Sequence, residues 1–190
     1  MFIDNLMNKF GYSEMYEWSE LFKYDIIPHG RFVTFDPNNP GKIILADSPD
    51  NVIGITTINT TIVSDNPTEW QGKYLCNEYG DIYLQKRDVA VAQNNYDDIN
   101  ELNYIGTIKK TEVVPVINSN YDPNKQYVKR SDRNEWAAVN ILGKCIVVDD
   151  GSCEAGGKCT VTLEGKATKA NDGYYVIGRL SENTIMIFFK

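Results

Sequence analysis

The sequence predicts a mainly β protein, an antiparallel β-meander or barrel-like single domain with a short N-terminal amphipathic helix. Its 190 residues suit one domain with a sizeable core. Twelve tyrosines, seven phenylalanines and three tryptophans favour strands over helices. Short β-branched segments also recur along the chain between turn sequences, as they do in meanders and barrels.

The first ten residues are predicted to form the helix. Its apolar residues recur at helical spacing, and polar residues take the other face. Gly11 follows at the position where a glycine commonly ends a helix. The apolar stripe must pack against its own domain or against a partner, and we expect it to bind another subunit or partner through Phe2, Ile3, Leu6, Met7 and Phe10.

From Tyr12 onward the pattern predicts strands. The segment from Tyr12 to Trp18 alternates without a clean apolar face. Later segments alternate with turn sequences such as DPNNPG and DSPD. A hairpin is expected around Asn77–Asp81. The other expected strands are RFVTF, KIILA, NVIGITTI, TTIVS, TEVVPVI, ILGKCIVV, YYVIGRL and TIMIFF.

The domain is expected to run from residue 11 to residue 190, after the helix of residues 1–10. Within it, Val91–Gly106 is polar and is interpreted as an insertion that is either helical or an irregular loop. Residues 118–136 read as a long polar connection. No internal repeat divides the chain.

Charge and composition argue against two classes of partner. The formal net charge of −7 disfavours nucleic acid, because phosphate binding needs a basic face. No segment reaches the ~18 apolar residues of a membrane span, and the N-terminal stripe lacks the basic excess of a membrane-surface helix. No secretory signal opens the chain. The protein is therefore expected to be made in a cytoplasm and kept there or assembled into a particle.

The four cysteines predict neither a metal site nor a fixed disulfide. Cys153 and Cys159 flank the glycine-rich turn EAGGK and could close a small loop as a disulfide, although reduced thiols are expected in a cytoplasm. Zinc would need two close cysteine pairs or cysteine with histidine, and His29 is the only histidine. No metal or cofactor is expected.

Most enzyme motifs are missing from the sequence. His29 has no nucleophile motif around it, and the turn Asp149–Gly151 has too few oxygen ligands for a calcium loop. That turn is interpreted as part of a hairpin. A hydrolase with two paired carboxylates is an alternative that the sequence neither supports nor excludes, because the meeting of two acids in space is not visible in a sequence.

One set of motifs resembles a known family, the glutamic-peptidase-type autoproteolytic intramolecular-chaperone domains at the C-termini of phage appendage and tailspike proteins. The resemblance begins at GYSEMYEW and continues through GRFVTF, GKIILA, VIGI, VSDNP and WQGKYLCNEYG. It then includes PVINSNYDP, YVKRSDRNEWAAVNILGKCIVVDDGSC and GYYVIGRLSENTIMIFFK. The order and spacing of these blocks over some 180 residues make the resemblance specific.

The resemblance implies a mostly β domain that trimerises, guides the folding of a fibre and then cuts itself free. The family cuts before the aspartate of an Asp-Tyr-Xaa-Glu-Tyr-Phe-Glu-Trp motif, and this aspartate acts with the glutamate three residues later. One carboxylate can take a proton while the other donates one to the leaving amine. The glutamate position is Glu14 here, and the aspartate position is Gly11.

Gly11 removes one of the two carboxylates, and only Met1–Phe10 precedes the motif. We therefore expect a stand-alone relative that keeps the fold without cleaving itself. It would be a structural or assembly protein of a virion, such as a minor capsid or fibre-associated component, that binds itself as a trimer or binds capsid or fibre proteins. The alternatives are an active self-cleaving chaperone that uses Asp4, Glu17 or Glu20 instead, and a β domain that binds an unidentified ligand.

Overall fold

The computed structural model describes residues 9–19, 28–96 and 102–190, and the side chains of these residues outside 93–106. The chain divides into two compact units, although a single domain was expected. Unit 1 comprises Met1–Thr68 and Val128–Lys190, and unit 2 comprises Glu69–Tyr127. No helix in the described part of the chain is long and apolar enough to cross a membrane.

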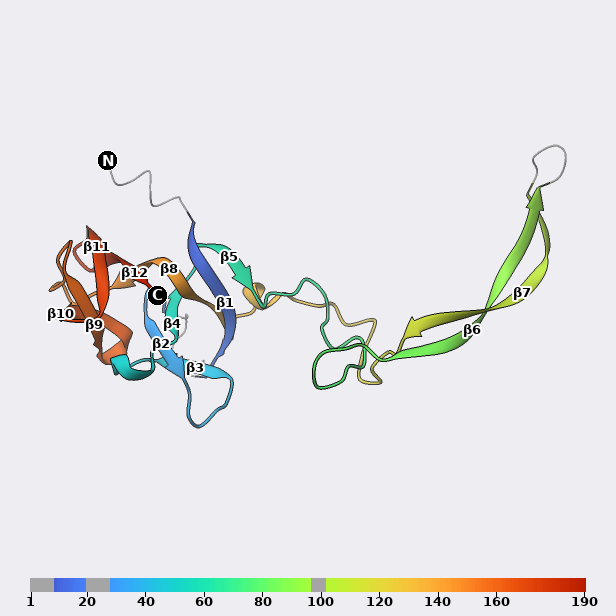
Figure 1. Cartoon of the computed structure of the whole chain (residues 1–190), viewed down its shortest axis with the longest axis horizontal. Helices are drawn as coiled ribbons and strands as arrows, with labels where there is room; N and C mark the ends of the chain where they lie inside the picture. Colours follow the sequence, from blue (N-terminus) through green and yellow to red (C-terminus); the bar gives the residue numbers. More distant parts are fainter. Residues whose placement is uncertain (1–8, 20–27, 97–101) are drawn as a thin grey trace. The chain divides into compact units, whose positions relative to one another are not determined.

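Unit 1 is built on one mixed sheet whose strands follow the order β10-β9-β11-β12-β8-β4-β2-β3-β1-β5. Figure 1 shows β1 beside β5 and the β9–β12 region at the other end of this unit. The strands are β1 (Phe10–Trp18), β2 (Phe32–Phe35), β3 (Lys42–Leu45), β4 (Gly54–Thr57), β5 (Thr60–Ser64), β8 (Trp136–Val148), β9 (Lys158–Thr162), β10 (Lys166–Ala170), β11 (Tyr174–Ser181) and β12 (Thr184–Phe189). Three 3₁₀ turns, at Pro49–Asn51, Arg130–Asp132 and Leu163–Gly165, complete the regular elements.

The mainly β prediction is confirmed, but the strands are not all antiparallel. β1 runs parallel to both β3 and β5, whereas β8 is antiparallel to β1, β4 and β12. The pairings β8–β4–β2–β3–β1 return to β8, so five strands form a closed circuit of pairings. The barrel-like arrangement stays a prediction. The closed circuit of five strand pairings is compatible with it.

Two apolar clusters stabilise unit 1. One packs between the circuit strands and contains Trp18, Val33, Ile43, Ala137 and Val139. The other lies between β8, β12 and the β9–β11 strands, where Phe32, Tyr174 and Phe189 stack in sequence with ring centroids 5.2 and 5.0 Å apart. β8 contributes to both clusters through alternate residues, with Ala137 and Val139 buried in the first and Cys145 and Val147 in the second.

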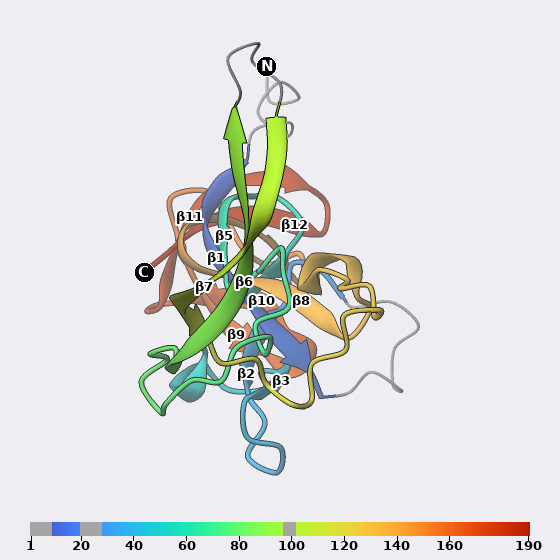
Figure 2. The same ribbon diagram turned by 90° about the vertical axis from the view of Figure 1, so that its right-hand side faces the viewer.

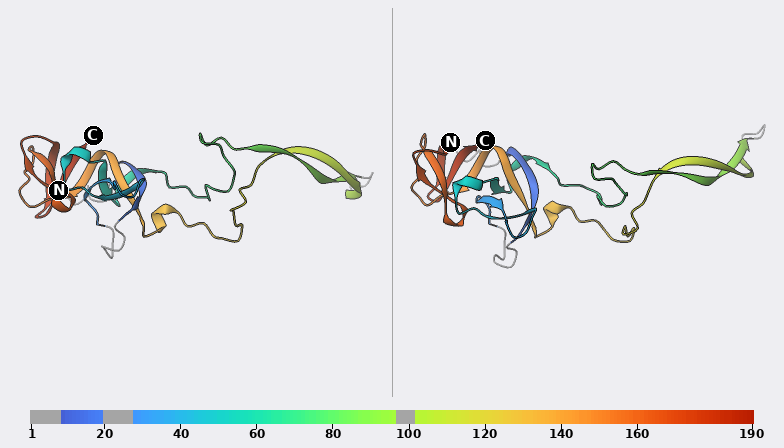
Figure 3. Two further views of the ribbon diagram at one scale, coloured as in Figure 1. Left: turned by 90° about the horizontal axis from the view of Figure 1, so that it is seen from below. Right: turned by 60° about the horizontal axis from the view of Figure 1, so that its bottom comes forward.

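Unit 2 contains a long antiparallel ribbon of two strands, β6 (Leu84–Tyr96) and β7 (Leu102–Pro115). Figure 2 shows the two strands running beside each other, and Figure 3 shows their twist. Val91–Gly106 therefore forms strand in its described residues, and neither the helical nor the irregular interpretation was right. The expected turn at Asn77–Asp81 is present, closed by a backbone hydrogen bond from Asn77 N to Asp81 O of 3.0 Å.

The predicted N-terminal helix falls mostly on residues 1–8, which lie outside the described residues, as do the partner-binding candidates Phe2 to Met7. Its predicted last residue, Phe10, is the first residue of β1 and pairs with Thr60. The extension of the helix to Phe10 is therefore wrong, because the sheet supplies backbone partners to this residue. Phe10 N also donates to Asn59 O at 3.4 Å.

Candidate functional site

The candidate site lies on β1, the strand that carries GYSEMYEW. β1 is held on one side by β5 and on the other by β8, so the motif lies inside the sheet of unit 1. The ladder with β8 shifts by one residue between Tyr12 and Ser13, which pair with Leu142 and Asn140. This β-bulge places Gly11 at an irregular point of the strand.

Glu14 is half-buried and is held by two tyrosines of its own strand. Tyr16 Oη donates to Glu14 Oε2 at 2.8 Å, and Tyr12 Oη donates to Glu14 Oε1 at 3.4 Å. The three side chains share one face because they are two residues apart. Burial, followed by the bond to Glu14, raises the pKa of Tyr16 to about 12. Tyr16 therefore stays protonated and keeps donating to the carboxylate.

Gly11, the residue predicted to stand at the position of the family's aspartate, has surroundings that leave no room for a side chain. Its φ of 68° is in the left-handed region that favours glycine. A Cβ there would lie 2.3 Å from Asn140 Nδ2 and 2.7 Å from the backbone oxygen of Leu142. A carboxylate at this position would therefore require β8 to move as well as the Asn140 side chain.

Asn140 fixes the bulge from the β8 side. Its side chain is 1% exposed, donates to Lys144 O at 2.9 Å and accepts from Leu142 N at 3.1 Å. Both ends of the amide are thus used to hold the irregular turn of β8. Sequence reasoning missed this residue, because nothing in one sequence indicates that Asn140 contacts a glycine 129 positions earlier.

The other groups considered near the motif are engaged elsewhere. Ser13 is completely buried, and its hydroxyl donates to Thr60 Oγ1 at 2.8 Å, so it is not an accessible nucleophile. Glu17 pairs with Lys42 at 2.6 Å. It is three residues from Glu14 and so faces the opposite side of the strand. Asp4 and Glu20 lie outside the described residues.

The candidates outside β1 do not form an active site. His29 is exposed in the bend before β2. Cys153 and Cys159 are buried free thiols, and their disulfide stays a prediction. Burial raises the pKa of Cys153 to about 11 and that of Cys159 to about 12, which keeps both thiols protonated at neutral pH.

The only group of potential metal ligands in the described residues is Asp149, Asp150 and Cys153. Asp149 is engaged by Arg179, whose Nη2 and Nη1 donate to its Oδ2 and Oδ1 at 2.7 and 3.3 Å. Arg179 also donates to Cys153 O at 2.6 Å. The charge of Asp149 is therefore already neutralised by its ion pair with Arg179. The turn Asp149–Gly151 was interpreted as part of a hairpin. It does not join paired strands, since β8 pairs with β12 and not with β9.

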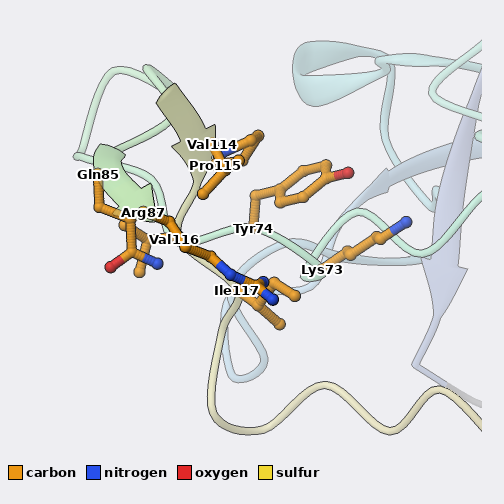
Figure 4. A pocket seen from close by; sticks show the side chains of 8 residues that line it. All are labelled: Lys73, Tyr74, Gln85, Arg87, Val114, Pro115, Val116 and Ile117. Atoms are coloured by element: carbon orange, nitrogen blue, oxygen red, sulfur yellow. The ribbon is translucent and has the colours of Figure 1, made fainter. Parts of the chain in front are cut away.

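A pocket of about 420 Å³ lies within unit 2 at the base of the ribbon. Figure 4 shows the eight residues that line it, among them Tyr74, Lys73 and Arg87. The Lys73 side chain extends away from Arg87 in this view, so the two cations do not converge on one ligand position. The pocket therefore does not add a second candidate site.

Comparison with solved structures identifies the fold. A crystal structure of the pre-mature bacteriophage phi29 gene product 12 superposes with a TM-score of 0.67 at 25% identity, over 96% of this chain and 22% of that one. The C-terminal fragment of the same gene product gives a TM-score of 0.64 at 26% identity, over 94% and 99% of the two chains.

Sequence relatives point the same way. The preneck appendage protein of Bacillus phage PZA is 30% identical over 162 residues, which are 85% of this chain and 16% of that protein. The pre-neck appendage protein of Bacillus phage phi29 is 29% identical over 146 residues, 76% of this chain and 15% of that protein. The chain thus spans about a sixth of the length of these relatives. Residues 5–186 match the model of the Peptidase_G2 family, described as the IMC autoproteolytic cleavage domain, and the chain belongs to this family.

Proposed function

We propose that this chain is an assembly domain of a phage appendage or a related virion component, and that it associates with itself or with fibre or capsid proteins without cutting itself. The observation that carries the proposal is Gly11 in a family whose motif has an aspartate there. Membership of the family and similarity to pre-neck appendage proteins support the assembly role.

The geometry around Gly11 supports the absence of cleavage. Loss of one acid removes half of the proton-transfer pair. The carboxylate of Asp65, whose charge acts on Tyr16, is engaged in an ion pair with Arg130. Asn140 and the Leu142 carbonyl fill the space that an aspartate side chain would need. The site is thus adapted to glycine and does not simply lack a side chain.

Glu14 then has a structural role. Its carboxylate accepts from Tyr12 and Tyr16 on the face of β1 that packs towards Val139, its partner in β8. Two donors offset the cost of partly burying the charge. The carboxylate and the two hydroxyls keep the start of β1 in register beside the bulge.

Exposed apolar residues on the ribbon support self-association, which we propose to be trimeric. An isolated two-stranded ribbon is marginally stable in water, because it buries little apolar surface. Leu84, Val113 and Ile108 are 63%, 62% and 49% exposed. Contact with equivalent ribbons or with a fibre protein would bury these side chains and stabilise the two strands.

The mass of freshly purified protein tests whether the chain cuts itself. The proposal expects one species at the full 21.6 kDa, with no product that begins at Gly11. The Glu14→Gln variant should have the same intact-chain mass apart from the substitution. A wild-type product without residues 1–10 that disappears in Glu14→Gln would overturn the inactive assignment and favour the second candidate, an active self-cleaving chaperone.

One observation favours that second candidate, namely the retention of Glu14 with two hydroxyl partners at the family's catalytic position. In it, Asp4 or Glu20 would have to supply the second carboxylate. Substitution of each by its amide should then abolish the product that begins at Gly11. If no product forms in the wild-type protein, this candidate is excluded.

Light scattering during size exclusion, at two protein concentrations, tests self-association. A mass of three times 21.6 kDa at both concentrations is the expected result. Val113→Lys should reduce the mass, because it places a charge on an apolar side chain of the ribbon. The matched control is Ala92→Lys, an exposed position on the same face with far less apolar surface. A monomeric wild-type protein would contradict the proposed trimer. Binding to fibre or capsid proteins would then be the remaining form of the assembly role.

A further inference from the structure

The outer face of the β8–β12–β11 sheet carries an exposed apolar patch. We call it the outer patch and define it as Leu142, Tyr175, Ile177 and Phe188, which are 53%, 56%, 46% and 40% exposed. Tyr175 and Phe188 are direct neighbours across β11 and β12, and Phe188 pairs with Lys144 of β8. Leu142 precedes Lys144 by two residues, so the alternation of β8 exposes both.

The opposite face of the same strands is already the core. Val176, Ile187 and Phe189 are 2%, 0% and 6% exposed there and alternate with the patch residues. An antiparallel sheet with one solvated face normally carries polar residues on that face. Here the outer face carries four large apolar residues beside Lys144 and Lys158, and this apolar patch indicates that something covers it.

The start of β1 lies at the edge of the patch. Tyr12 pairs with Leu142. Gly11 and Gly143 are also in close contact, because a Cβ added to Gly143 would lie only 3.1 Å from the Cα of Gly11. Gly143 in turn pairs with Phe189, the residue after Phe188. The N-terminal segment, residues 1–8, is therefore joined to the sheet within a few residues of the patch.

This segment has the length and chemistry to cover the patch. Eight residues span about 12 Å as a helix and up to about 26 Å when extended, whereas three strands lie within about 10 Å of one another. The segment carries four apolar residues at helical spacing, and Asp4 is its only acid. Lys144 is exposed among the patch residues, so it offers Asp4 a complementary charge.

From these observations we infer that the outer patch is a docking surface for the N-terminal segment of the same chain, with the stripe of Phe2, Ile3, Leu6 and Met7 packed on Leu142, Tyr175, Ile177 and Phe188. The docking holds the segment that precedes the motif against the sheet, next to the Phe10–Gly11 peptide bond. It is an interface within the chain and differs from the self-association proposed for the ribbon.

A pair of engineered cysteines tests this contact. Cys76 is the exposed native thiol and is first replaced by serine. Leu6→Cys is then combined with Leu142→Cys, and the control combines Asn5→Cys with Leu142→Cys. A disulfide needs Cα atoms about 4.4–6.8 Å apart, so only a docked stripe brings the two thiols together with high yield. We expect a cross-link within one chain, several-fold more abundant for Leu6→Cys than for the control and independent of protein concentration.

Three results would overturn the inference. A cross-link between two chains would show that a second copy covers the patch. Equal yields for Leu6→Cys and Asn5→Cys would show that the stripe does not dock specifically. The lack of any cross-link would show that the segment does not contact the patch.

Hydrogen exchange provides a second test that needs no disulfide. Leu6→Asp should increase exchange of the β12 amides several-fold relative to Asn5→Asp, since only the first variant places a charge in the apolar stripe. Unchanged exchange in Leu6→Asp contradicts the docking. Both tests rest on the proposed absence of cleavage, because a cut before Gly11 would release the segment. Neither test depends on whether the ribbon forms trimers, and the intact mass separates a failure of the docking from loss of the segment.

Discussion

The two units of this chain form strands in different ways. In the part of the chain that the structure describes, every fully buried apolar side chain belongs to unit 1. The ribbon of unit 2 has a ladder of thirteen paired positions, yet its apolar residues Leu84, Ile108 and Val113 stay exposed. Regular strand pairing is thus found in both units, whereas a hydrophobic core is found in one.

The difference teaches where the stability of each unit originates. Backbone hydrogen bonds in a strand pair replace bonds to water and contribute little net free energy. Burial of apolar surface contributes about 25 cal/mol per Å² and is the dominant favourable contribution. Unit 1 therefore has its own source of stability, whereas the ribbon buries little apolar surface of its own, in keeping with the contact that we propose for it.

The largest effect should come from truncating the core of unit 1. Phe32 is fully buried and stacks on Tyr174, so Phe32→Ala should lower the free energy of unfolding by about 4 kcal/mol. In the dissociated chain, Val113→Ala on the ribbon should change it by less than about 0.5 kcal/mol, because this side chain is 62% exposed there. Urea unfolding followed by circular dichroism measures both. Similar losses in the two variants would contradict the difference between the units.

A smaller effect is expected from the ion pair between Asp149 and Arg179. The Asp149 side chain is fully buried, whereas Arg179 is 31% exposed. Asp149→Asn removes the only carboxylate that the described hydrogen bonds offer the guanidinium, which keeps its backbone acceptors, and should cost about 3 kcal/mol in urea unfolding. The matched control is Asp172→Asn in the pair with Lys158, where the Asp172 side chain is 94% exposed and a much smaller loss is expected. A comparable loss in both variants would argue against burial as the cause.

Much of the strand content was predictable from local sequence. RFVTF, KIILA and TTIVS correspond to β2, β3 and β5, and YYVIGRL and TIMIFF correspond to the paired strands β11 and β12. The ribbon was not predicted in full, because its β6 sequence, LQKRDVAVAQNNY, has too few apolar residues to show a buried face. The parallel pairing of β1 with β3 and β5 was also not predictable, since it joins residues distant in sequence.

The candidate site was predictable in part. The resemblance assigns the family's two acid positions to Glu14 and Gly11, and this assignment stays a prediction. The reason why this position must be glycine lies in Asn140 and Leu142, on a strand that follows some 130 residues later. Likewise, the tyrosine partners of Glu14 follow from alternation along β1 once the strand is known. Local sequence thus indicates which residues of β1 are candidates for the site. Which residues of β8 surround them depends on long-range strand pairing.

Gly11 allows that long-range contribution to be measured. Gly11→Ala places a Cβ against Asn140 and Leu142 at a φ of 68°, whereas Gly41→Ala has a φ of 85° and no atom within 4 Å of the new Cβ. The left-handed backbone costs about 1–2 kcal/mol at either position. Gly11→Ala should therefore destabilise the protein by more than Gly41→Ala, by about 1 kcal/mol, in urea unfolding. Equal losses would show that β8 yields easily and would weaken the explanation of the missing acid.

The smallest change in stability is expected when acid protonates Asp36, and it tests the turn that follows β2 in unit 1. The hydrogen bond from Ser19, followed by bonds from Asn39 and from the Asn38 backbone, lowers the pKa of Asp36 to about 2, below the ~3.9 of an unfolded chain. Since the folded pKa is depressed, the stability that this carboxylate contributes is present above pH ~4 and is lost as the pH falls towards 2. Asp36→Asn should remove this part of the acid dependence, and Ser19→Ala should reduce it by less. Unfolding in urea at pH 5, 4, 3 and 2 measures the slope. If the wild-type protein and Asp36→Asn lose stability in parallel over this range, the hydrogen bonds to Asp36 do not stabilise the turn, and the acid dependence arises from other carboxylates.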